Sequence, residues 1–261
     1  MLSKSRRQLI ERLKTRKGRP REGLVLVEGV RSAAEALASG VDIRFAVQSP
    51  RLLGTEAGRA LASTLAGGGP EAEEVDDSDL DEISATEHPQ GILFVCTEPG
   101  LDLGQLRDRA PSRLLLLDGL QDPGNLGTLI RAARAFGLDA VIVLDGSVDP
   151  WNPKAVRAAA GAGFQMPIVR VPWAEARPWL EERGRQILAA DLAGDDVRSF
   201  HPGGSWALVV GNEGTGLRAD IAAASAKSIA IPMPGSAESL NAGVAGSILL
   251  YSLLTRGSVP L

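Results

Sequence analysis

Short apolar runs alternate with amphipathic segments along most of the chain. In the first part the apolar runs predict three strands, at residues 23–28, 43–47 and 91–96. The amphipathic segments predict three helices, at residues 3–16, 31–39 and 56–65, and glycines follow the second and the third. This alternation predicts a small α/β domain over residues 1–97.

The same alternation restarts after a stretch with Pro and Gly, in which we place a linker at residues 98–108. Five further strands are predicted, at residues 114–118, 140–144, 186–190, 206–210 and 228–231. Helices are expected at residues 126–136, 154–160, 217–224 and in the final segment around 247–254. The run at 114–118 is continuously apolar, which is typical of a strand buried on both faces. Residues 109–261 should therefore form a parallel sheet covered by helices.

Composition narrows the class of protein. The 261 residues are 44% hydrophobic and 23% charged, as in ordinary globular proteins, and no apolar run approaches the roughly 20 residues that cross a bilayer. The N-terminus carries no secretory signal pattern. The single cysteine, Cys96, lies in an apolar run and is expected in the core, and the only histidines are His88 and His201. We expect a cytoplasmic protein with no membrane segment and no metal site.

The net charge of −4 hides an uneven distribution. Residues 1–21 hold nine Lys and Arg against Glu11, whereas residues 71–82 hold eight acids and no base. The basic segment is either a solvated helix face or a surface for nucleic-acid phosphates, and the clustering favours the latter. The acidic run is expected to be a solvated surface. Candidate phosphate contacts are Arg6, Arg7, Lys14, Arg16, Lys17, Arg19 and Arg21, with Arg134 of the second domain.

Three loops at predicted strand ends carry the candidate chemistry, because ligands of open α/β sheets bind beyond the carboxyl ends of strands. The first, DGLQDPGNLGTLIR, contains Asn125 where a helix cap is expected, and Arg131 six residues later. The second, GNEGTGL, places three glycines around Glu213. The third, IPMPGSAESLNAG, includes Ser239 and Asn241. Neither a dinucleotide fingerprint nor a P-loop occurs.

Small residues open the last predicted helix: Ala242, Gly243, Ala245 and Gly246. They suit a place where two backbones approach closely. An ordinary C-terminal helix packed on a sheet edge would tolerate the same composition.

Together the three motifs DPGNLGTLIRAARAFG, GNEGTGL and IPMPGSAESLNAGVA resemble motifs 1, 2 and 3 of the SpoU/TrmH branch of the SPOUT RNA methyltransferases. The resemblance covers about residues 112–256. The stretches REGLVLVEGVR and HPQG are similar to the substrate-binding domain that precedes the catalytic domain in many members. That domain resembles certain large-subunit ribosomal proteins.

This resemblance implies a ribose 2′-O-methyltransferase that acts on RNA with S-adenosylmethionine and works as a homodimer. It implies a parallel sheet whose C-terminal part forms a deep trefoil knot, a feature that sequence patterns alone argue against. The family's polar catalytic positions match Asn125, Arg131, Glu213, Ser239 and Asn241. The cofactor would be held at Ala190, Gly211, Ile231, Met233 and Leu240.

Arg131 matches the family position that is often assigned to activation of the ribose hydroxyl. A guanidinium keeps its proton at neutral pH, so clamping a phosphate and stabilising the developing alkoxide is the easier role. Glu213 or a water would then accept the proton.

Three alternatives differ in substrate or class. A transfer RNA substrate is less favoured than ribosomal RNA, because compact transfer-RNA members often lack an N-terminal extension. A catalytically silent RNA-binding module would be expected to lose Asn125, Arg131 or the Ser239–Asn241 motif, and all are present. A nucleotide-dependent oxidoreductase is disfavoured because no fingerprint loop follows residues 114–118.

Overall fold

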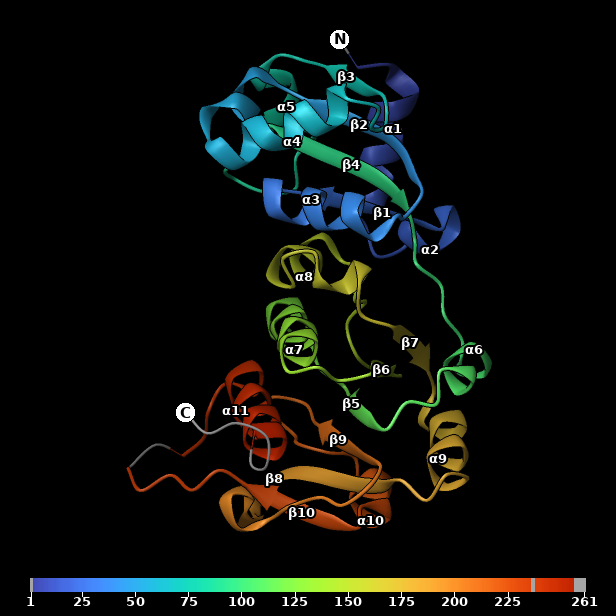
Figure 1. Cartoon of the computed structure of the whole chain (residues 1–261), viewed down its shortest axis with the longest axis vertical. Helices are drawn as coiled ribbons and strands as arrows, with labels where there is room; N and C mark the ends of the chain where they lie inside the picture. Colours follow the sequence, from blue (N-terminus) through green and yellow to red (C-terminus); the bar gives the residue numbers. More distant parts are fainter. Residues whose placement is uncertain (1, 236–237, 256–261) are drawn as a thin grey trace. The chain divides into compact units, whose positions relative to one another are not determined.

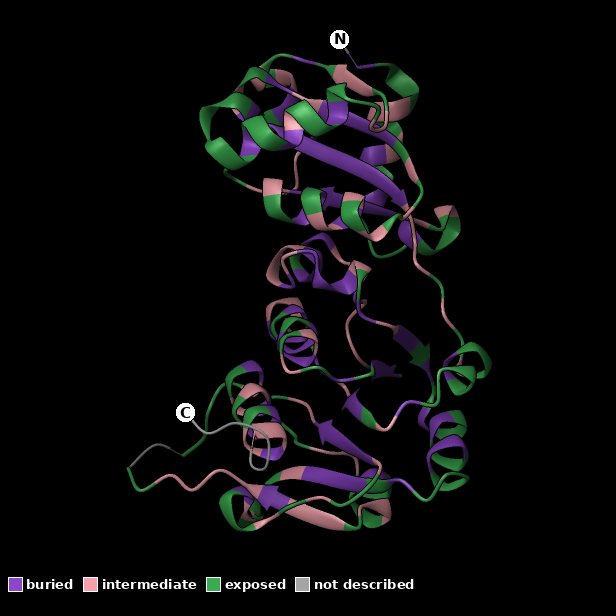
Figure 2. Ribbon diagram, in the orientation of Figure 1, coloured by how far each residue is buried: buried purple, intermediate pink, exposed green. Residues whose placement is uncertain are grey.

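The computed structural model describes residues 2–235 and 238–255, which form two compact units (Figure 1). Unit 1 comprises Met1–Pro99 and Trp151–Gln165, and unit 2 comprises Gly100–Pro150 and Met166–Leu261. In both units the central strands are mostly buried, whereas most helices bury one side and expose the other (Figure 2). Within the described ranges no helix is long and apolar enough to cross a membrane.

Unit 1 is built on a four-stranded sheet with the order β1-β4-β2-β3. The strands are β1 (Leu24–Glu28), β2 (Ile43–Gln48), β3 (Ala72–Glu74) and β4 (Ile92–Thr97). β4 pairs antiparallel with β1 and β2, and β3 pairs parallel with β2. The helices of Met1–Pro99 are α1 (Lys4–Leu13), α2 (Arg19–Glu22), α3 (Val30–Ser39), η1 (Pro50–Gly54), α4 (Glu56–Ala66) and α5 (Asp77–Ile83).

The core of unit 1 joins the first helix to the acidic segment. Ile10 and Leu13 of α1 and Leu80 of α5 are fully buried and belong to one cluster with sheet residues such as Leu93. The expectation that residues 71–82 form only a solvated surface was wrong. Their acids alternate with apolar residues that supply a strand and a helix, and the acids on the outer side form ion pairs with α1. Cys96 is fully buried, as expected, and burial raises its pKa to about 12.

Residues 151–165 belong to unit 1 although they fall within the second half of the sequence. They form α8 (Pro153–Ala158), which contacts β1, and η2 (Ala162–Phe164), which contacts α3. Gly161, between them, has φ +82° and lies so close to α3 that a Cβ would be 2.5 Å from Cβ of Glu35. Only glycine permits this approach.

Unit 2 contains a six-stranded parallel sheet with the order β10-β8-β9-β5-β6-β7. Its strands are β5 (Arg113–Leu117), β6 (Ala140–Leu144), β7 (Ile168–Val171), β8 (Gln186–Asp196), β9 (Trp206–Val210) and β10 (Lys227–Ala230). Its helices are α6 (Leu103–Asp108), α7 (Pro123–Ala135), α9 (Trp173–Glu181), η3 (Val197–Ser199), α10 (Ala219–Ala224) and α11 (Ala242–Thr255).

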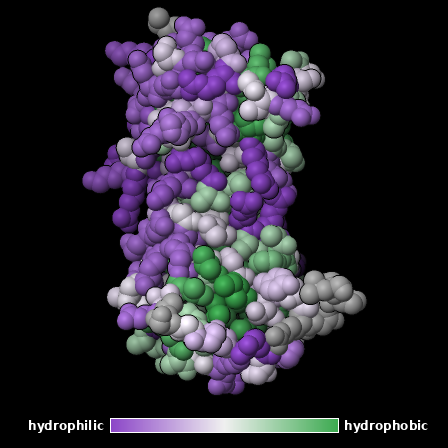
Figure 3. Space-filling view, turned by 90° about the vertical axis from the view of Figure 1, so that its left-hand side faces the viewer, coloured by the Kyte–Doolittle hydropathy of each residue, from purple (hydrophilic) through white to green (hydrophobic). Residues whose placement is uncertain are grey.

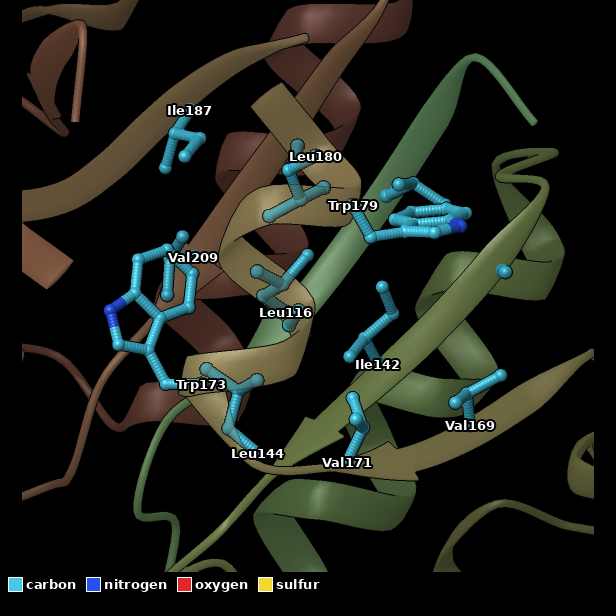
Figure 4. Close-up of a cluster of buried hydrophobic side chains, with 14 of the residues drawn as sticks. Leu116, Ile142, Leu144, Val169, Val171, Trp173, Trp179, Leu180, Ile187 and Val209 are labelled. Atoms are coloured by element: carbon cyan, nitrogen blue, oxygen red, sulfur yellow. The ribbon is translucent and has the colours of Figure 1, made fainter. Parts of the chain in front are cut away.

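Helices cover both faces of the unit 2 sheet, so its central strands carry apolar residues on both faces. On one face Leu116, Ile142 and Val209 pack with Trp179 and Leu180 of α9 (Figure 4). On the other face α11 packs against α7 and β9. A Cβ added to Gly246 of α11 would lie 2.4 Å from Leu129 Cδ2 and 3.2 Å from Val210 Cγ2. The small residues of α11 thus lie where it touches α7 and β9.

Most predicted strands and helices exist, and the differences have local causes. β7 and α9 were not expected, and α9 contains Pro178, a residue that usually interrupts helices. The segment expected as a linker contains α6. Asp102 caps the start of this helix and forms a reciprocal capping box with Gln105. α7 begins at Pro123 with Asp122 as its cap, so Asn125 is a residue of the first turn and not the cap.

Candidate functional site

The loops that follow β5 and β9 meet at the carboxyl edge of the unit 2 sheet. β9 pairs with β5, and β5 pairs with β6, so the ends of these three strands are neighbours. The loops after β5 and β9 correspond to the first two motifs of the sequence. The sheet order therefore brings Asn125 and Glu213 together although they are 88 residues apart.

Glu213 fastens the loop after β9 to the start of α7. Its carboxylate accepts hydrogen bonds from Asn125 Nδ2 at 2.9 Å, from the Gln121 amide at 3.2 Å and from the Asp122 amide at 3.3 Å. The Asn125 side chain, nearly buried on α7, is thereby fixed in orientation. These hydrogen bonds join the loop after β9 to the loop after β5. The sequence alone did not establish this connection.

The hydrogen bonds to Glu213 also decide its charge. Partial burial by itself would raise the pKa of Glu213, but the donors on Asn125, Gln121 and Asp122 outweigh it and the net pKa is lowered. The carboxylate is therefore ionised at neutral pH, and three donors occupy its oxygens. A group in this state holds a loop well and is poorly suited to accept a proton.

Arg218 makes a second connection between the strand ends. Its Nε donates to Asp118 Oδ1 at 2.7 Å and its backbone amide donates to Asp118 Oδ2 at 2.9 Å. Its Nη1 and Nη2 donate to Asp145, at 2.9 and 3.2 Å. Asp118 directly follows β5 and is 1% exposed, and Asp145 follows β6 and also accepts from the Trp173 amide. The hydrogen bond from Arg218 is the main reason why the pKa of Asp145 is lowered.

Asn212 closes the loop that carries Glu213. Its backbone exchanges two hydrogen bonds of 3.0 Å with Gly216, and its Oδ1 accepts from the amides of Gly214 and Thr215. Its Nδ2 donates to the Gly119 carbonyl at 2.8 Å, which ties this loop to the one after β5. A Cβ at Gly211 would lie 2.6 Å from the Gly216 carbonyl carbon, so the loop requires glycine at position 211.

The start of α11 lies against the start of α7. Asn241 caps α11, because its Oδ1 accepts from the amides of Gly243 and Val244 at 3.0 and 3.2 Å. A Cβ on Gly243 would be 3.3 Å from Asn125 Oδ1, so the third motif reaches the first. Ser239 and Leu240 precede the cap and are exposed.

Arg131 is exposed on α7, and its side chain makes no hydrogen bond or ion pair with any residue in 2–235 or 238–255. Arg134, one turn further along α7, is half-buried. Three of the expected cofactor positions are half-buried: Ala190, Ile231 and Met233. Ala190 lies within β8 and not at a strand end, because β8 continues to Asp196, whereas Ile231 and Met233 follow β10. No backbone hydrogen bond joins Ile231 or Met233 to another described residue, so their peptide groups can serve a ligand.

The basic N-terminal side chains differ in their exposure and in their protein partners, and therefore in whether they can contact RNA phosphates. Arg6 donates to Glu73 at 2.6 Å and lies over the Phe45 ring, Arg7 pairs with Asp79 and Glu82, and Lys14 pairs with Glu11. Arg19 is 1% exposed and donates to the carbonyls of Leu13 and Lys14. Burial of Arg19 contradicts its assignment as a phosphate contact, since its side chain is used to hold the turn after α1.

Three basic residues of this segment keep the expected character. Arg16, Lys17 and Arg21 are exposed and form no ion pair with other residues of the described structure. The potential for phosphate contacts in residues 1–21 is thus concentrated between α1 and β1.

Sequence reasoning missed Asp118, Gln121, Asp145, Asn212 and Arg218, which support the loops. A charged residue directly after a buried strand was the available signal for Asp118 and Asp145. Their common partner Arg218 had no signal, because the pairing exists only in the folded sheet. Among the described residues no group of His, Cys, Asp and Glu side chains has the arrangement of a metal site.

Comparisons with known proteins agree with this geometry. Residues 112–251 match the SpoU rRNA Methylase family model, and residues 6–93 match the MRM3-like substrate binding domain. The chain is 34% identical to the 23S rRNA (guanosine(2553)-2'-O)-methyltransferase RlmP of Bacillus subtilis, over 93% of each chain. It is 32% identical to the 23S rRNA (uridine(2479)-2'-O)-methyltransferase of Streptomyces viridochromogenes, over 94% of this chain and 87% of that one.

A solved structure extends the likeness to the whole chain. The AdoMet-bound rRNA methyltransferase from Sinorhizobium meliloti superposes with a TM-score of 0.85 and 29% identity, over 100% of this chain and 97% of that one. The fold of the whole chain is thus shared with this structure. The chain belongs to the SpoU rRNA methylase family.

Proposed function

We propose that this protein transfers a methyl group from S-adenosylmethionine to the 2′-oxygen of a ribose in ribosomal RNA. The observation that carries the proposal is the connection of Asn125 with Glu213, which holds the first two motif loops together beside the start of α11. Relatives that are named as 23S rRNA 2'-O-methyltransferases and span nearly the whole chain support the substrate class.

The residues near the third motif fit this cofactor. Adenine offers donors and acceptors on its edge, and the unpaired peptide groups of Ile231 and Met233 offer the complementary atoms. We assign the remaining contacts to Ala190, Leu240 and the backbone at Gly211, which packs closely against Gly216. When bound, S-adenosylmethionine supplies an electrophilic methyl group on a sulfonium.

Arg131 is the residue that we assign to the RNA. Its exposed guanidinium has no protein partner in the described ranges and can donate two parallel hydrogen bonds to a phosphate. A guanidinium in this position also stabilises negative charge on the 2′-oxygen as its proton leaves. Ser239, exposed before α11, is placed to hydrogen-bond the ribose, while Asn125, Glu213 and Asn241 orient the loops.

The proton acceptor that fits these contacts is a water and not Glu213. The lowered pKa of Glu213 and its three donors make it a positioning residue in our proposal. The sequence had left two proton acceptors open, Glu213 and a water, and of these we propose the water.

Residues 1–97 form the RNA-binding domain in this proposal, followed by a linker at 98–108 and the methyltransferase domain at 109–261. The match to a substrate-binding domain supports the first assignment. We propose that this domain has the fold of a large-subunit ribosomal protein. Arg16, Lys17, Arg21 and Arg134 remain our candidate phosphate contacts, together with Arg6, Arg7 and Lys14 where RNA displaces their acidic partners. A ribosomal RNA substrate implies a cytoplasmic enzyme.

A homodimer is supported by an exposed apolar stripe on α11. Val244, Ile248 and Tyr251 repeat at helical spacing and are 47, 38 and 48% exposed, next to Leu240. Figure 3 shows a hydrophobic patch on the face that carries α11. Contiguous apolar surface of this kind marks protein interfaces, and we propose that α11 packs against a second copy of the chain.

A trefoil knot in the C-terminal part also belongs to the proposal. Its support is the close packing of α11 against α7, β9 and η3, which lie before it in the chain. Gly243 and Gly246 permit this approach because any side chain there would meet α7.

Methyl transfer in vitro tests the proposed function directly. Purified protein is incubated with methyl-labelled S-adenosylmethionine and either ribosomal or transfer RNA from cells that lack the gene. Digestion to nucleosides should yield one 2′-O-methylated nucleoside from ribosomal RNA. Label on a base, or on transfer RNA alone, would contradict the proposal, and no label with cofactor bound would indicate a silent RNA-binding module.

A further inference from the structure

Unit 1 contains a cavity of about 250 Å³, separate from the three motif loops of unit 2 and lined in part by the stretches REGLVLVEGVR and HPQG. It lies at the end of β1 and the start of α3, and α8 completes its wall. Its lining includes Glu28, Arg31, His88, Gln90 and Arg157. The volume is several times the roughly 30 Å³ that one water occupies in the liquid, so the cavity has room for a larger polar group.

The walls of the cavity are held in place by specific contacts. Gln90 Oε1 accepts from the Val30 amide at 2.8 Å, which fixes the loop before β4 to the start of α3. Gly29 has φ +95°, and a Cβ there would lie 3.2 Å from Gln90 Oε1. The cavity is therefore part of the folded structure of unit 1.

Two buried polar atoms at this cavity have no hydrogen-bond partner within the described structure: Glu28 Oε2 and Arg157 Nη1. Glu28 is 4% exposed, and its other oxygen accepts from the Ala85 amide at 2.7 Å. Burial raises the pKa of Glu28, against the opposing effects of the Ala85 amide and the Arg157 charge. A buried acceptor and a buried donor without partners are unfavourable, which points to a ligand that offers the opposite groups.

Among the parts of an RNA chain, guanine best supplies this set. Its Watson–Crick edge places two donors, N1–H and the N2 amino group, beside the O6 acceptor. A carboxylate accepts both donors, and a guanidinium donates to O6. Adenine and cytosine place one amino group beside a ring nitrogen lone pair, which would face the carboxylate. Uracil places one donor between two acceptors.

We propose that this cavity binds an unpaired guanine of the RNA substrate, with Glu28 accepting from its N1–H and N2 amino groups and Arg157 donating to its O6. His88 and Arg31 offer a planar imidazole and a guanidinium at the cavity for stacking on the base. The proposal rests on the RNA substrate of the proposed function. It assigns unit 1 a base-specific contact in addition to phosphate contacts, which carry no sequence information.

The test uses the full-length protein and eight-nucleotide uridine oligomers with one central guanosine, inosine, 7-deazaguanosine or adenosine, followed by fluorescence anisotropy. Inosine lacks the N2 amino group, and loss of one hydrogen bond to a charged acceptor should weaken binding about tenfold relative to guanosine. Adenosine should bind at least as weakly as inosine. 7-Deazaguanosine keeps the Watson–Crick edge and should bind like guanosine. Equal binding of guanosine and inosine would overturn the inference.

A variant then assigns the preference to this cavity. Glu28→Gln should abolish the guanosine-over-inosine preference, because an amide replaces one acceptor by a donor. Glu71→Gln, an exposed carboxylate of the same unit, serves as the control and should keep the preference. A thermal unfolding curve verifies that Glu28→Gln is folded. If it is not, Arg157→Met on the half-exposed side chain replaces it and should reduce the preference for guanosine over adenosine instead, because guanosine and inosine share the O6 acceptor and adenosine lacks it. A preference that survives in the folded variant would overturn the proposal.

The outcomes also separate this inference from the proposed function. Methyl transfer to ribosomal RNA without any guanosine preference would leave the function intact and overturn only the guanine site. Failure of every oligomer and of ribosomal RNA to bind would overturn both.

Discussion

Asn125 Nδ2 lies 2.9 Å from Glu213 Oε1 and joins the first turn of α7 to the loop after β9. Because Gly243 at the start of α11 lies against Asn125, one side chain connects all three motif loops. The contacts of Asn125 hold the three loops in one arrangement, and an in-line methyl transfer depends on such positioning.

Replacement of Glu213 should loosen this assembly. In Glu213→Gln the new amide group faces the donors of Asn125, Gln121 or Asp122, so at least one hydrogen bond is lost. We expect S-adenosylmethionine to bind about tenfold more weakly, which corresponds to one charge-assisted hydrogen bond. Calorimetry measures the affinity, and an unchanged dissociation constant would show that the loop does not need this contact.

The pH dependence of stability follows from the same carboxylates. The pKa values of Glu213 and Asp145 are lowered in the folded protein, so each contributes stability that is present above its unfolded pKa. That stability is lost as pH falls through the lower folded values, in a window below about pH 4. Melting curves from pH 7 to pH 3 should fall less steeply for Glu213→Gln than for the unmodified protein.

Removal of Arg218 should destabilise unit 2. Asp118 is buried, and without Arg218 its charge has neither the ion pair nor the Nε donor. Arg218→Met should reduce the free energy of unfolding by about 2 kcal/mol, less than a fully buried pair because Arg218 is partly exposed. Urea unfolding of Arg218→Met, Asp118→Asn and the double variant measures the coupling. Additive losses would mean that the pair contributes nothing.

Substitution of Arg131 should separate binding of the cofactor from transfer of the methyl group. Arg131→Ala is expected to lower the transfer rate by about 10²–10³, the usual cost of losing a donor to a developing oxyanion. S-adenosylmethionine affinity should stay the same. Arg131→Lys should restore little activity, because an ammonium lacks the planar fork. Arg177→Ala, an exposed arginine of α9, is the matched control, and a rate like that of this control would refute a role in transfer.

The salt dependence of RNA binding tests the basic segment. Deletion of residues 1–21 would remove the buried Ile10 and Leu13, so neutralising substitutions are the cleaner experiment. The triple variant Arg16→Ala, Lys17→Ala, Arg21→Ala should reduce the slope of log K against log salt by about 2, at about 0.7 for each single-strand phosphate contact. Arg19→Ala should instead destabilise unit 1. An unchanged slope in the triple variant would exclude this surface.

A charge on the exposed face of α11 should disrupt the proposed dimer. Ile248→Glu places a carboxylate in the apolar stripe without touching the buried side of the helix, where Leu249 and Leu253 pack. Analytical ultracentrifugation should give a dimer for the unmodified protein and a monomer for Ile248→Glu. A monomeric unmodified protein would contradict the proposal.

The sequence determined the type of most elements and the position of the chemistry. The continuous apolar run of β5 predicted a buried parallel strand, since a strand covered on both faces has no polar side. The motifs around Asn125, Glu213 and Asn241 indicated both the family and the loops, because loop function depends on residue types at fixed local spacing. Gly243 and Gly246 indicated a close approach of α11 to another segment, although the sequence did not show that this segment is α7.

Only the tertiary structure decided which side chains meet. Arg218 pairs with Asp118, 100 residues earlier, because the sheet order makes their loops neighbours. Glu28 and Arg157 line the same cavity because residues 151–165 belong to unit 1. Burial of Arg19 and exposure of Arg16 could not be read from a run of like charges. Local patterns report neighbours within a few residues, whereas burial and long-range pairing depend on where the whole chain folds back on itself.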